Sequence, residues 1–168
     1  VKTRNTRTGC QSSPITSQVP DGKVYPILSL TSTGSTNCDP AFTPDGTATA
    51  SVTNPGADSY GFQWFDGGAV GVNPLGAPNN GTSATAINLG GPVGAPKPYT
   101  VLVTNQRSGC TNFSTVGVAD VSVIPVISFA NIVPNDICSP ATNFSGQLQA
   151  QIDNQVGLIT DYQFTWYN

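Results

Sequence analysis

The stretch VLVTNQRSGC, residues 101–110, organises this chain of 168 residues, because a variant of it, VKTRNTRTGC, occupies residues 1–10. Cys10 thus falls on Cys110 at an offset of 100, and the same offset carries Cys38 onto Cys138. A period near 100 residues is much longer than a solenoid unit and is about the length of one immunoglobulin-type β-sandwich. The repeat therefore predicts a string of domains, each of them a sandwich.

The phase of this repeat divides the chain into three parts. Residues 1–24 are expected to be the last strands of one repeat, 25–124 a complete repeat, and 125–168 the first strands of the next. Val1 begins mid-pattern, with neither a basic nor a hydrophobic leader before it, so the chain is expected to be a mature, exported segment. Excerpting from a longer chain of repeats explains the two incomplete parts.

The composition predicts an all-β protein. Charged residues make up 9% of the chain, every acidic residue is Asp, and Glu, His and Met are absent. Thr, Ser, Val, Asn, Gly and Pro, which prefer strands and turns, stand where helix formers would be needed. The net charge of −3 argues against a nucleic-acid partner. No apolar run approaches the roughly 20 residues of a membrane helix, so no membrane insertion is expected.

Alternating apolar and polar residues predict the strands of the middle repeat. They are residues 25–33, 47–53, 59–65, 98–104 and 111–124, with a weaker sixth at 82–89. Turn sequences such as PDG and NPG separate them. Residues 67–97, rich in Gly, Pro and Asn, are predicted to pass around the edge of the sandwich as a spacer. A ligand, if one binds, is expected in this segment.

Aromatic residues at alternate positions occur twice, at an offset of 102: Tyr60, Phe62 and Trp64, then Tyr162, Phe164 and Trp166. Alternate residues of a strand share one face, so these rings are predicted to point toward the partner sheet, where an immunoglobulin-like domain holds its central tryptophan. A stacking surface for sugars or proline-rich peptides is the alternative. The predicted structural core contains Tyr60, Phe62, Trp64, Tyr99 and Trp166.

Four cysteines at spacings of 28, 72 and 28 residues, without any histidine, favour disulfides over a zinc site: Cys10, Cys38, Cys110 and Cys138. The favoured pairing joins Cys38 to Cys110 inside the middle repeat and leaves Cys10 and Cys138 to other repeats. The rival pairing joins Cys10 to Cys38 and Cys110 to Cys138, which would staple successive repeats across their junctions.

Catalysis and metal binding find little support. No His is present, no carboxylates are visibly paired and no Ser lies in a nucleophile motif, so no enzyme is expected. Four aspartates are candidate calcium ligands: Asp21, Asp45, Asp58 and Asp66. No dense Asp-x-Asp loop accompanies them, so turn capping is the preferred interpretation and no cofactor is expected.

A family resemblance rests on a Cys, a PDG turn, a strand, an aromatic-x-Trp strand and the ending YTVLVTNQRSGCTNFSTVGVADVSV at residues 99–123. This order resembles the tandem Ig-like repeats of large Bacteroidetes surface adhesins, including those of gliding-motility filaments. The resemblance covers Cys38 to about Ile124. It implies export, display at the bacterial cell surface, and adhesion or filament building. The long segment 67–97 and the thin basic content depart from the pattern.

Three functions are therefore expected, in this order. The first is a structural stalk, in which the repeat contacts neighbouring repeats or identical chains in an extracellular filament. The second is an Ig-like module that binds carbohydrate or protein, such as surface glycans or host proteins, through residues 67–97. The third is a strand-exchange polymer, in which residues 1–24 of one subunit complete the sandwich left open at residues 146–168 of another.

Overall fold

The fold is that of a computed structural model, which describes residues 1–39, 42–138 and 144–167. In this part of the chain the strands are β1 (Leu28–Thr33), β2 (Gly46–Val52), β3 (Tyr60–Asp66), β4 (Thr85–Leu89), β5 (Lys97–Asn105), β6 (Thr111–Val118), β7 (Ile127–Val133) and β8 (Gln147–Ile152). The helical turns are the 3-10 segments η1 (Ala77–Asn79) and η2 (Ile159–Asp161). The all-β prediction is confirmed.

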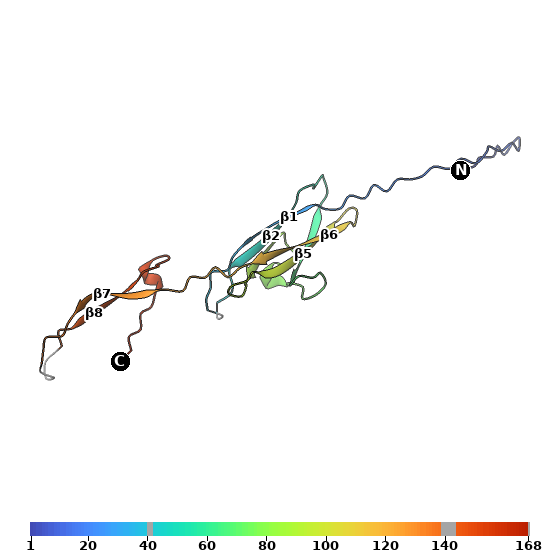
Figure 1. The fold of residues 1–168 in the computed structure, drawn as a ribbon. Coiled ribbons are helices and arrows are strands. Elements are labelled where there is room, and N and C mark those ends of the chain that lie inside the picture. Colours follow the sequence, from blue (N-terminus) through green and yellow to red (C-terminus); the bar gives the residue numbers. More distant parts are fainter. Residues whose placement is uncertain (40–41, 139–143, 168) are drawn as a thin grey trace.

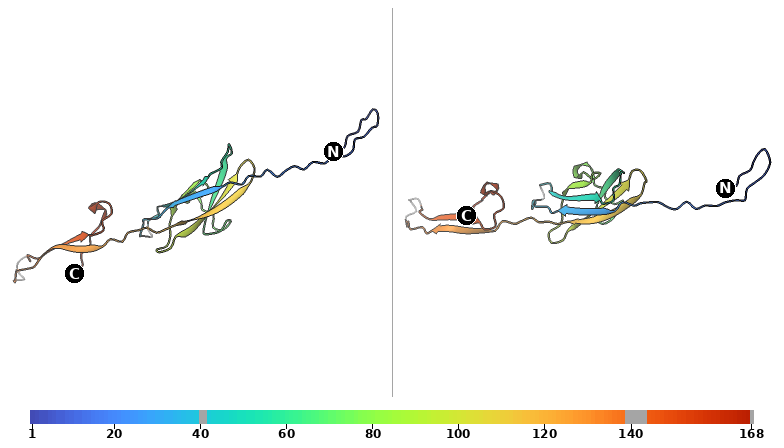
Figure 2. Two further views of the ribbon diagram at one scale, coloured as in Figure 1. Left: turned by 45° about the horizontal axis from the view of Figure 1, so that its top comes forward. Right: turned by 90° about the horizontal axis from the view of Figure 1, so that it is seen from above.

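Strands β1 to β6 form one sandwich of two antiparallel sheets, with strand orders β1-β2-β4 and β3-β5-β6. This is the immunoglobulin arrangement of first, second and fifth strands facing third, sixth and seventh, without the fourth strand. Figures 1 and 2 show the sandwich in the middle of the molecule. The N-terminal arm (residues 1–24) leaves from one end, and the β7–β8 hairpin lies beyond the other.

The core sits between the two sheets and is built on a single large side chain, Trp64, which is fully buried. Its indole Nε1 donates a hydrogen bond to the Ser83 carbonyl at 3.0 Å, so the polar end of the ring is satisfied. The residues packed in the same cluster are Ala48, Ala50, Ala86, Leu89, Tyr99, Val101, Val103 and Val118. Three alanines in the β1-β2-β4 sheet leave room for the indole.

The five aromatic residues expected in the core differ in burial. Trp64 and Tyr99 are buried, and Tyr60 and Phe62 are half-buried against the same cluster. Trp166 is 56% exposed. Residues 162–167 form no strand, although β3, their counterpart in the middle repeat, pairs with β5 from Tyr60 to Asp66. The given sequence has no counterpart of β5 after residue 167, so this segment lacks a strand to pair with.

The segment 67–97 covers an edge of the sandwich instead of forming one open loop. It contains η1 and β4, and its backbone bonds along the free side of β3. The Leu75 amide donates to the Trp64 carbonyl at 2.9 Å, and the Trp64 amide donates to the Gly81 carbonyl at 2.7 Å. Because an uncovered edge strand invites pairing with other chains, this cover keeps β3 closed.

The turn that ends β5 occurs a second time, in the N-terminal arm. In one copy the Asn105 Oδ1 accepts hydrogen bonds from the amides of Arg107 and Ser108, at 2.9 and 3.0 Å. In the other copy the Asn5 Oδ1 accepts from the amides two and three residues on, at 2.9 and 3.1 Å. A glycine with positive φ follows each asparagine by four residues, Gly109 at 72° and Gly9 at 76°. The sequence repeat is thus also a repeat of local geometry.

The entry into the sandwich occurs twice as well. The Asn54 Oδ1 accepts a hydrogen bond from the Ile27 amide at 2.7 Å, and its Nδ2 donates to the Tyr25 carbonyl at 3.2 Å. Before β7 and after β8, Asn154 makes the same two bonds, with the Val126 amide at 2.6 Å and the Ile124 carbonyl at 2.9 Å. Strands β7 and β8 therefore start as β1 and β2 do.

Candidate functional site

The sandwich has two ends along the line of the molecule, and both carry polar clusters that hold the connecting segments. We call the end at which the chain enters β1 the N-terminal pole, and the end at which it leaves β6 the C-terminal pole. The turns after β2 and β5 lie at the N-terminal pole, because β1 and β6 start there and β2 and β5 run antiparallel to them. Figure 2 shows that the N-terminal arm and the β7–β8 hairpin leave from opposite poles.

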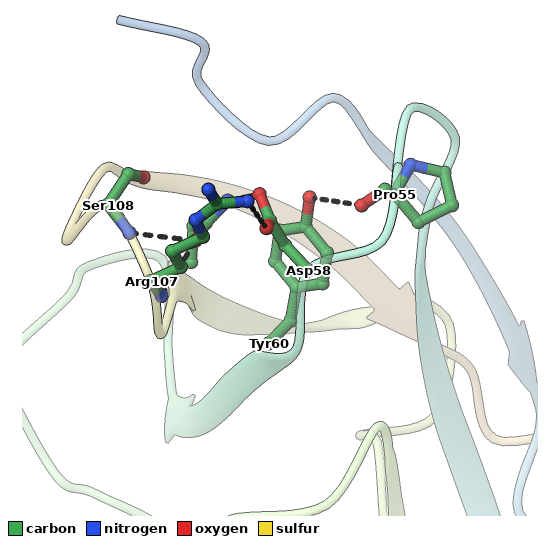
Figure 3. Close-up of polar contacts among 6 residues, drawn as sticks. Pro55, Asp58, Tyr60, Arg107 and Ser108 are labelled. Carbon is green, nitrogen blue, oxygen red and sulfur yellow. Dashed lines mark hydrogen bonds and ion pairs between the residues drawn. The ribbon is translucent and has the colours of Figure 1, made fainter.

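The centre of the N-terminal pole is the side chain of Asn105, which is only 4% exposed (Figure 3). Its Nδ2 donates to the Asp58 Oδ2 at 2.8 Å while its Oδ1 caps the turn that follows β5. The Arg107 Nη1 lies 3.5 Å from the other oxygen of Asp58. Since the Arg107 side chain is 82% exposed, solvent screens this ion pair. The amide network, more than the charge, fixes the turn.

Two further hydrogen bonds close the N-terminal pole. The Tyr60 Oη donates to the Pro55 carbonyl at 3.0 Å, as Figure 3 shows, and so holds the turn between β2 and β3. The Asn112 Nδ2 donates to the Pro26 carbonyl at 2.9 Å and ties the entering chain to the first turn of β6. The linker before β1 is therefore fastened to both sheets.

A groove of about 730 Å³ lies at the N-terminal pole, between the entering linker at residues 21–25 and the turn at residues 105–111. Its charged lining comprises the Lys23–Asp21 pair, 3.1 Å apart, and the Asp58 and Arg107 groups. Cys110 also lines this groove. The groove faces the N-terminal arm, where a preceding domain of a string would lie (Figure 1).

At the C-terminal pole, Ser35 fastens the segment that leaves β6. Its amide donates to the Ala119 carbonyl and its carbonyl accepts from the Val121 amide, both at 2.8 Å. The adjacent Thr36 donates from its amide to the Asp45 Oδ1 at 2.7 Å and from its hydroxyl to Oδ2 at 2.5 Å. These hydrogen bonds from Thr36 hold the pKa of the Asp45 carboxyl below its ordinary value. The leaving linker is thus pinned to the loop that follows β1.

The four cysteines are all free thiols in the structure, and the expected disulfide between Cys38 and Cys110 is not formed. Cys38 follows β1 and lies at the C-terminal pole, whereas Cys110 precedes β6 at the N-terminal pole. The six residues of β1 separate the poles by about 20 Å, while disulfide-bonded Cα atoms lie within about 7 Å. The rival pairing of Cys10 with Cys38 fails for the same reason, since the whole sandwich lies between them (Figure 1).

The segment 67–97, where sequence analysis placed a possible ligand, lines a hollow of about 630 Å³ near the C-terminal pole. The Lys97 Nζ lies 2.8 Å from the Asp66 Oδ2 and 5.2 Å from the centre of the Tyr99 ring. Desolvation lowers the pKa of Lys97, but the hydrogen bond to Asp66 and the nearby Tyr99 outweigh it, so the pKa is raised. The hollow therefore carries a paired ammonium group and no free cation at this position.

The four aspartates considered for calcium lie in four separate places, each with a local partner. Those partners are Lys23 for Asp21, Thr36 for Asp45, Asn105 for Asp58 and Lys97 for Asp66. Within the described residues, no three metal-ligating side chains come together. Asp21 caps a turn, because its Oδ1 accepts from the Lys23 amide at 3.2 Å.

The β7–β8 hairpin has an uncovered apolar face. Residues of both strands and of the segment 162–167 line a depression of about 380 Å³, among them Ile127, Phe129, Ile152 and Trp166. The rings of Phe129 and Trp166 lie 6.1 Å apart, tilted by 33°. The corresponding residues of the sandwich, Leu28, Leu30 and Val52, pack against the core. The hairpin is thus half of a sandwich without its second sheet.

The fold and the two poles define an all-β protein built on an immunoglobulin-like sandwich with connecting segments fastened at opposite ends. Comparison of the chain with protein-family models, with curated proteins and with solved structures finds no match. Across residues 1–39, 42–138 and 144–167, no helix has the length and apolar character needed to span a membrane.

Sequence analysis did not single out the residues that fasten the poles, which are Ser35, Asn54, Asn105 and Asn112. Two of them carried a signal in the repeat. Asn105 recurs as Asn5 in the sequence N-x-R-x-G-C, and Asn54 recurs as Asn154, both at the offset of 100. Polar residues that keep their place in a repeat with few identities are candidates for hydrogen-bonded structure. Ser35 has no such signal.

Proposed function

We propose that the protein is a structural segment of an extracellular adhesin or surface filament, in which sandwiches joined end to end give reach from the cell surface. The observation that carries the proposal is that the chain enters and leaves the sandwich at opposite poles (Figures 1 and 2). Domains with this connection add their lengths, because each new sandwich continues the line of the one before it.

The fastened linkers support the same function. Asn54 holds the entering segment and Ser35 holds the leaving one, so each sandwich has a defined direction relative to its connections. The asparagine bonds of the entry recur at Asn154. A string of such units is directed without a wide contact between neighbours. The proposal includes no catalysis, since the carboxylates described above are engaged in separate local bonds.

Small-angle X-ray scattering on the 168-residue chain tests the extended shape. A compact protein of this length has a radius of gyration of about 15 Å, and 100 residues give about 13 Å. We expect a value at least about one and a half times that of the compact chain, with the mass of a monomer. The control is residues 25–124 alone, which should give the compact value. A radius near 15 Å for the whole chain contradicts the proposal.

Surface display is tested on the cells that produce the protein. We expect an antibody against the sandwich to label intact cells, and added protease to remove that label without lysis. Labelling only after permeabilisation contradicts the extracellular location.

Strand exchange between chains is a second candidate function, favoured by the uncovered apolar face of the β7–β8 hairpin. The N-terminal arm matches the end of β5 and all of β6 in sequence, so one chain's arm is a possible cover for another chain's hairpin. Light scattering during size-exclusion chromatography separates the two functions. Strand exchange requires a mass that rises with concentration, whereas the string of repeats requires a constant monomer mass.

A further inference from the structure

The two cysteines of the sandwich lie at opposite poles, one at each junction with a neighbour. Cys110 lines the groove at the N-terminal pole, on the side of the preceding domain. Cys38 is exposed and lies at the C-terminal pole, on the side of the following domain. Cys10 and Cys138 occupy the same positions in the flanking repeats. Every junction of such a string therefore receives one cysteine of each kind, from two different sandwiches.

Both cysteines of a junction are held near the linker that crosses it. At the C-terminal pole, Ser35 binds Val121 of the linker, and Cys38 stands three residues further on. At the next entry, Pro125 takes the place of Pro26, as YPILSL and IPVISF align. In the sandwich, Pro26 is bonded to Asn112, two residues after Cys110.

The chain lengths allow the two thiols to meet. From Ser35 to Cys38 the backbone reaches at most about 10 Å, and from Val121 to Pro125 about 14 Å. A disulfide needs its Cα atoms within about 7 Å, so these overlapping reaches permit the bond. The groove of about 730 Å³ beside Cys110 gives a loop of the preceding sandwich space to enter.

We propose that Cys38 forms a disulfide with the cysteine that occupies the Cys110 position of the sandwich following it in the string. Each junction then carries one covalent staple, whether the following sandwich is completed by the same chain or by another. The inference rests on the proposed end-to-end function. It replaces both pairings expected from the sequence, because it joins unlike poles of neighbouring sandwiches.

The bond forms by thiol–disulfide exchange with an oxidised protein or small-molecule disulfide. The Cys38 thiolate attacks one sulfur of this disulfide and releases one thiol, giving a mixed disulfide. The thiolate at the Cys110 position then displaces the second thiol. Two cysteine thiols are oxidised to one disulfide, and the exchanging disulfide is reduced to two thiols.

The staple changes how the string responds to force, because of the segment between Cys110 and Cys138. This segment has 28 residues, counted from 110 to 138, and runs through β6, the linker and β7 from one pole to the far pole of the next sandwich. Both strands are already extended along the molecule in Figure 1. The covalent path through stapled junctions uses one such segment for every two sandwiches, so unfolding adds almost no length.

Pulling experiments on the exported protein measure this directly. Without disulfides, each unfolding sandwich of about 100 residues releases about 30 nm of chain. A disulfide within one sandwich would leave about 28 residues per repeat in the covalent path, or about 10 nm fully stretched. With stapled junctions, we expect the oxidised protein to show no unfolding step of 10 nm or more. Steps of about 30 nm should appear after reduction.

A thiol count with the variant Cys38→Ser gives the sharper test, since Cys38 is exposed and its replacement leaves the core intact. In denaturant without reductant, we expect the wild-type protein to bind no maleimide. The variant should gain one labelled thiol, and peptide mapping should place it at the Cys110 position of the following sandwich. Asn37→Ser, one residue away, should leave the count unchanged.

Two results would overturn the staple. If the thiols are free, the variant loses one maleimide instead of gaining one. If the label appears on Cys110 of the same sandwich, the bond lies within a repeat. Neither result affects the proposed stalk, which the scattering experiment tests by shape alone.

Discussion

Two tryptophans in the same sequence context have opposite surroundings. Trp64 is completely buried between the sheets, and its Nε1 is bonded to the Ser83 carbonyl. Trp166 is 56% exposed beside Phe129 on the unfinished hairpin. The contribution of each ring to stability therefore depends on the presence of the facing sheet, and substitution measures that difference.

Replacing Trp64 with Ala is expected to destabilise the sandwich by about 3–5 kcal/mol, because it leaves a large cavity in the core. Urea denaturation monitored by far-UV circular dichroism measures the change. Trp166→Ala is the matched control and should change the main transition by less than about 0.5 kcal/mol. Similar losses for the two variants would mean that the two rings share one cooperative core.

Asn105 and Asn5 form a second matched pair. Asn105→Ala removes the acceptor of two turn amides and the donor to Asp58 in a buried place, so we expect a loss of about 1–3 kcal/mol in unfolding free energy. Asn5 makes the same turn bonds in the exposed arm. Asn5→Ala should leave the midpoint of urea denaturation unchanged. An equal midpoint for the two variants would show that the turn at Asn105 adds nothing to the sandwich.

Asp45 predicts how the C-terminal pole responds to acid. Hydrogen bonds from Thr36 lower the pKa of the folded carboxyl below its ordinary value of 3.8. A depressed pKa gives stability that is present above the unfolded pKa and is lost as pH falls through the folded pKa. Asp45→Asn should therefore be less stable than wild type at pH 6, and the difference should shrink below about pH 4. Thermal unfolding across this range measures it, and a constant difference contradicts the assignment.

At the scale of elements, alternation in the sequence predicted the strands near their observed places. β2, β3, β5 and β6 begin within two residues of the predicted starts, because each buries alternate side chains against one core. β6 ends at Val118, earlier than the predicted Ile124, because the Ser35 bonds convert residues 119–121 into the fastened linker. The hydrogen bonds that end a strand came from a distant loop and had no local signal.

The order of cysteines could not be converted into a disulfide from spacing alone. Pairing depends on which pole each cysteine occupies, and the pole depends on the direction of every strand between the two. The spacing of 72 residues between Cys38 and Cys110 suits closure of one repeat, yet an odd number of strand crossings puts the two at opposite poles. The groove beside Cys110 likewise arises from a linker and a turn far apart in sequence.

At the scale of the whole molecule, the folded core belongs entirely to the sandwich. Every buried residue of the core cluster lies between Ala48 and Val118. The N-terminal arm has one isolated bridge, between Arg4 and Gln11, and the hairpin β7–β8 has one pair of strands. A two-stranded ribbon is at best marginally stable in water without a facing sheet. The three parts are thus expected to differ in stability even though they repeat one sequence pattern.

Hydrogen exchange measures this difference. In the 168-residue chain at a concentration that keeps it monomeric, we expect the amides of Val101 and Val103 in β5 to exchange only through global unfolding. Amides of β7 and β8 that are bonded between the strands, such as those paired at Ile127 and Ile152, should exchange orders of magnitude faster. The physical reason is that their apolar face, with Phe129 and Trp166, is not covered. If β7 and β8 are protected as well as β5, a second sheet must cover them. Because the given chain has no such strands after residue 167, the cover must come from another copy, and protection that fades on dilution would then favour strand exchange over the stalk.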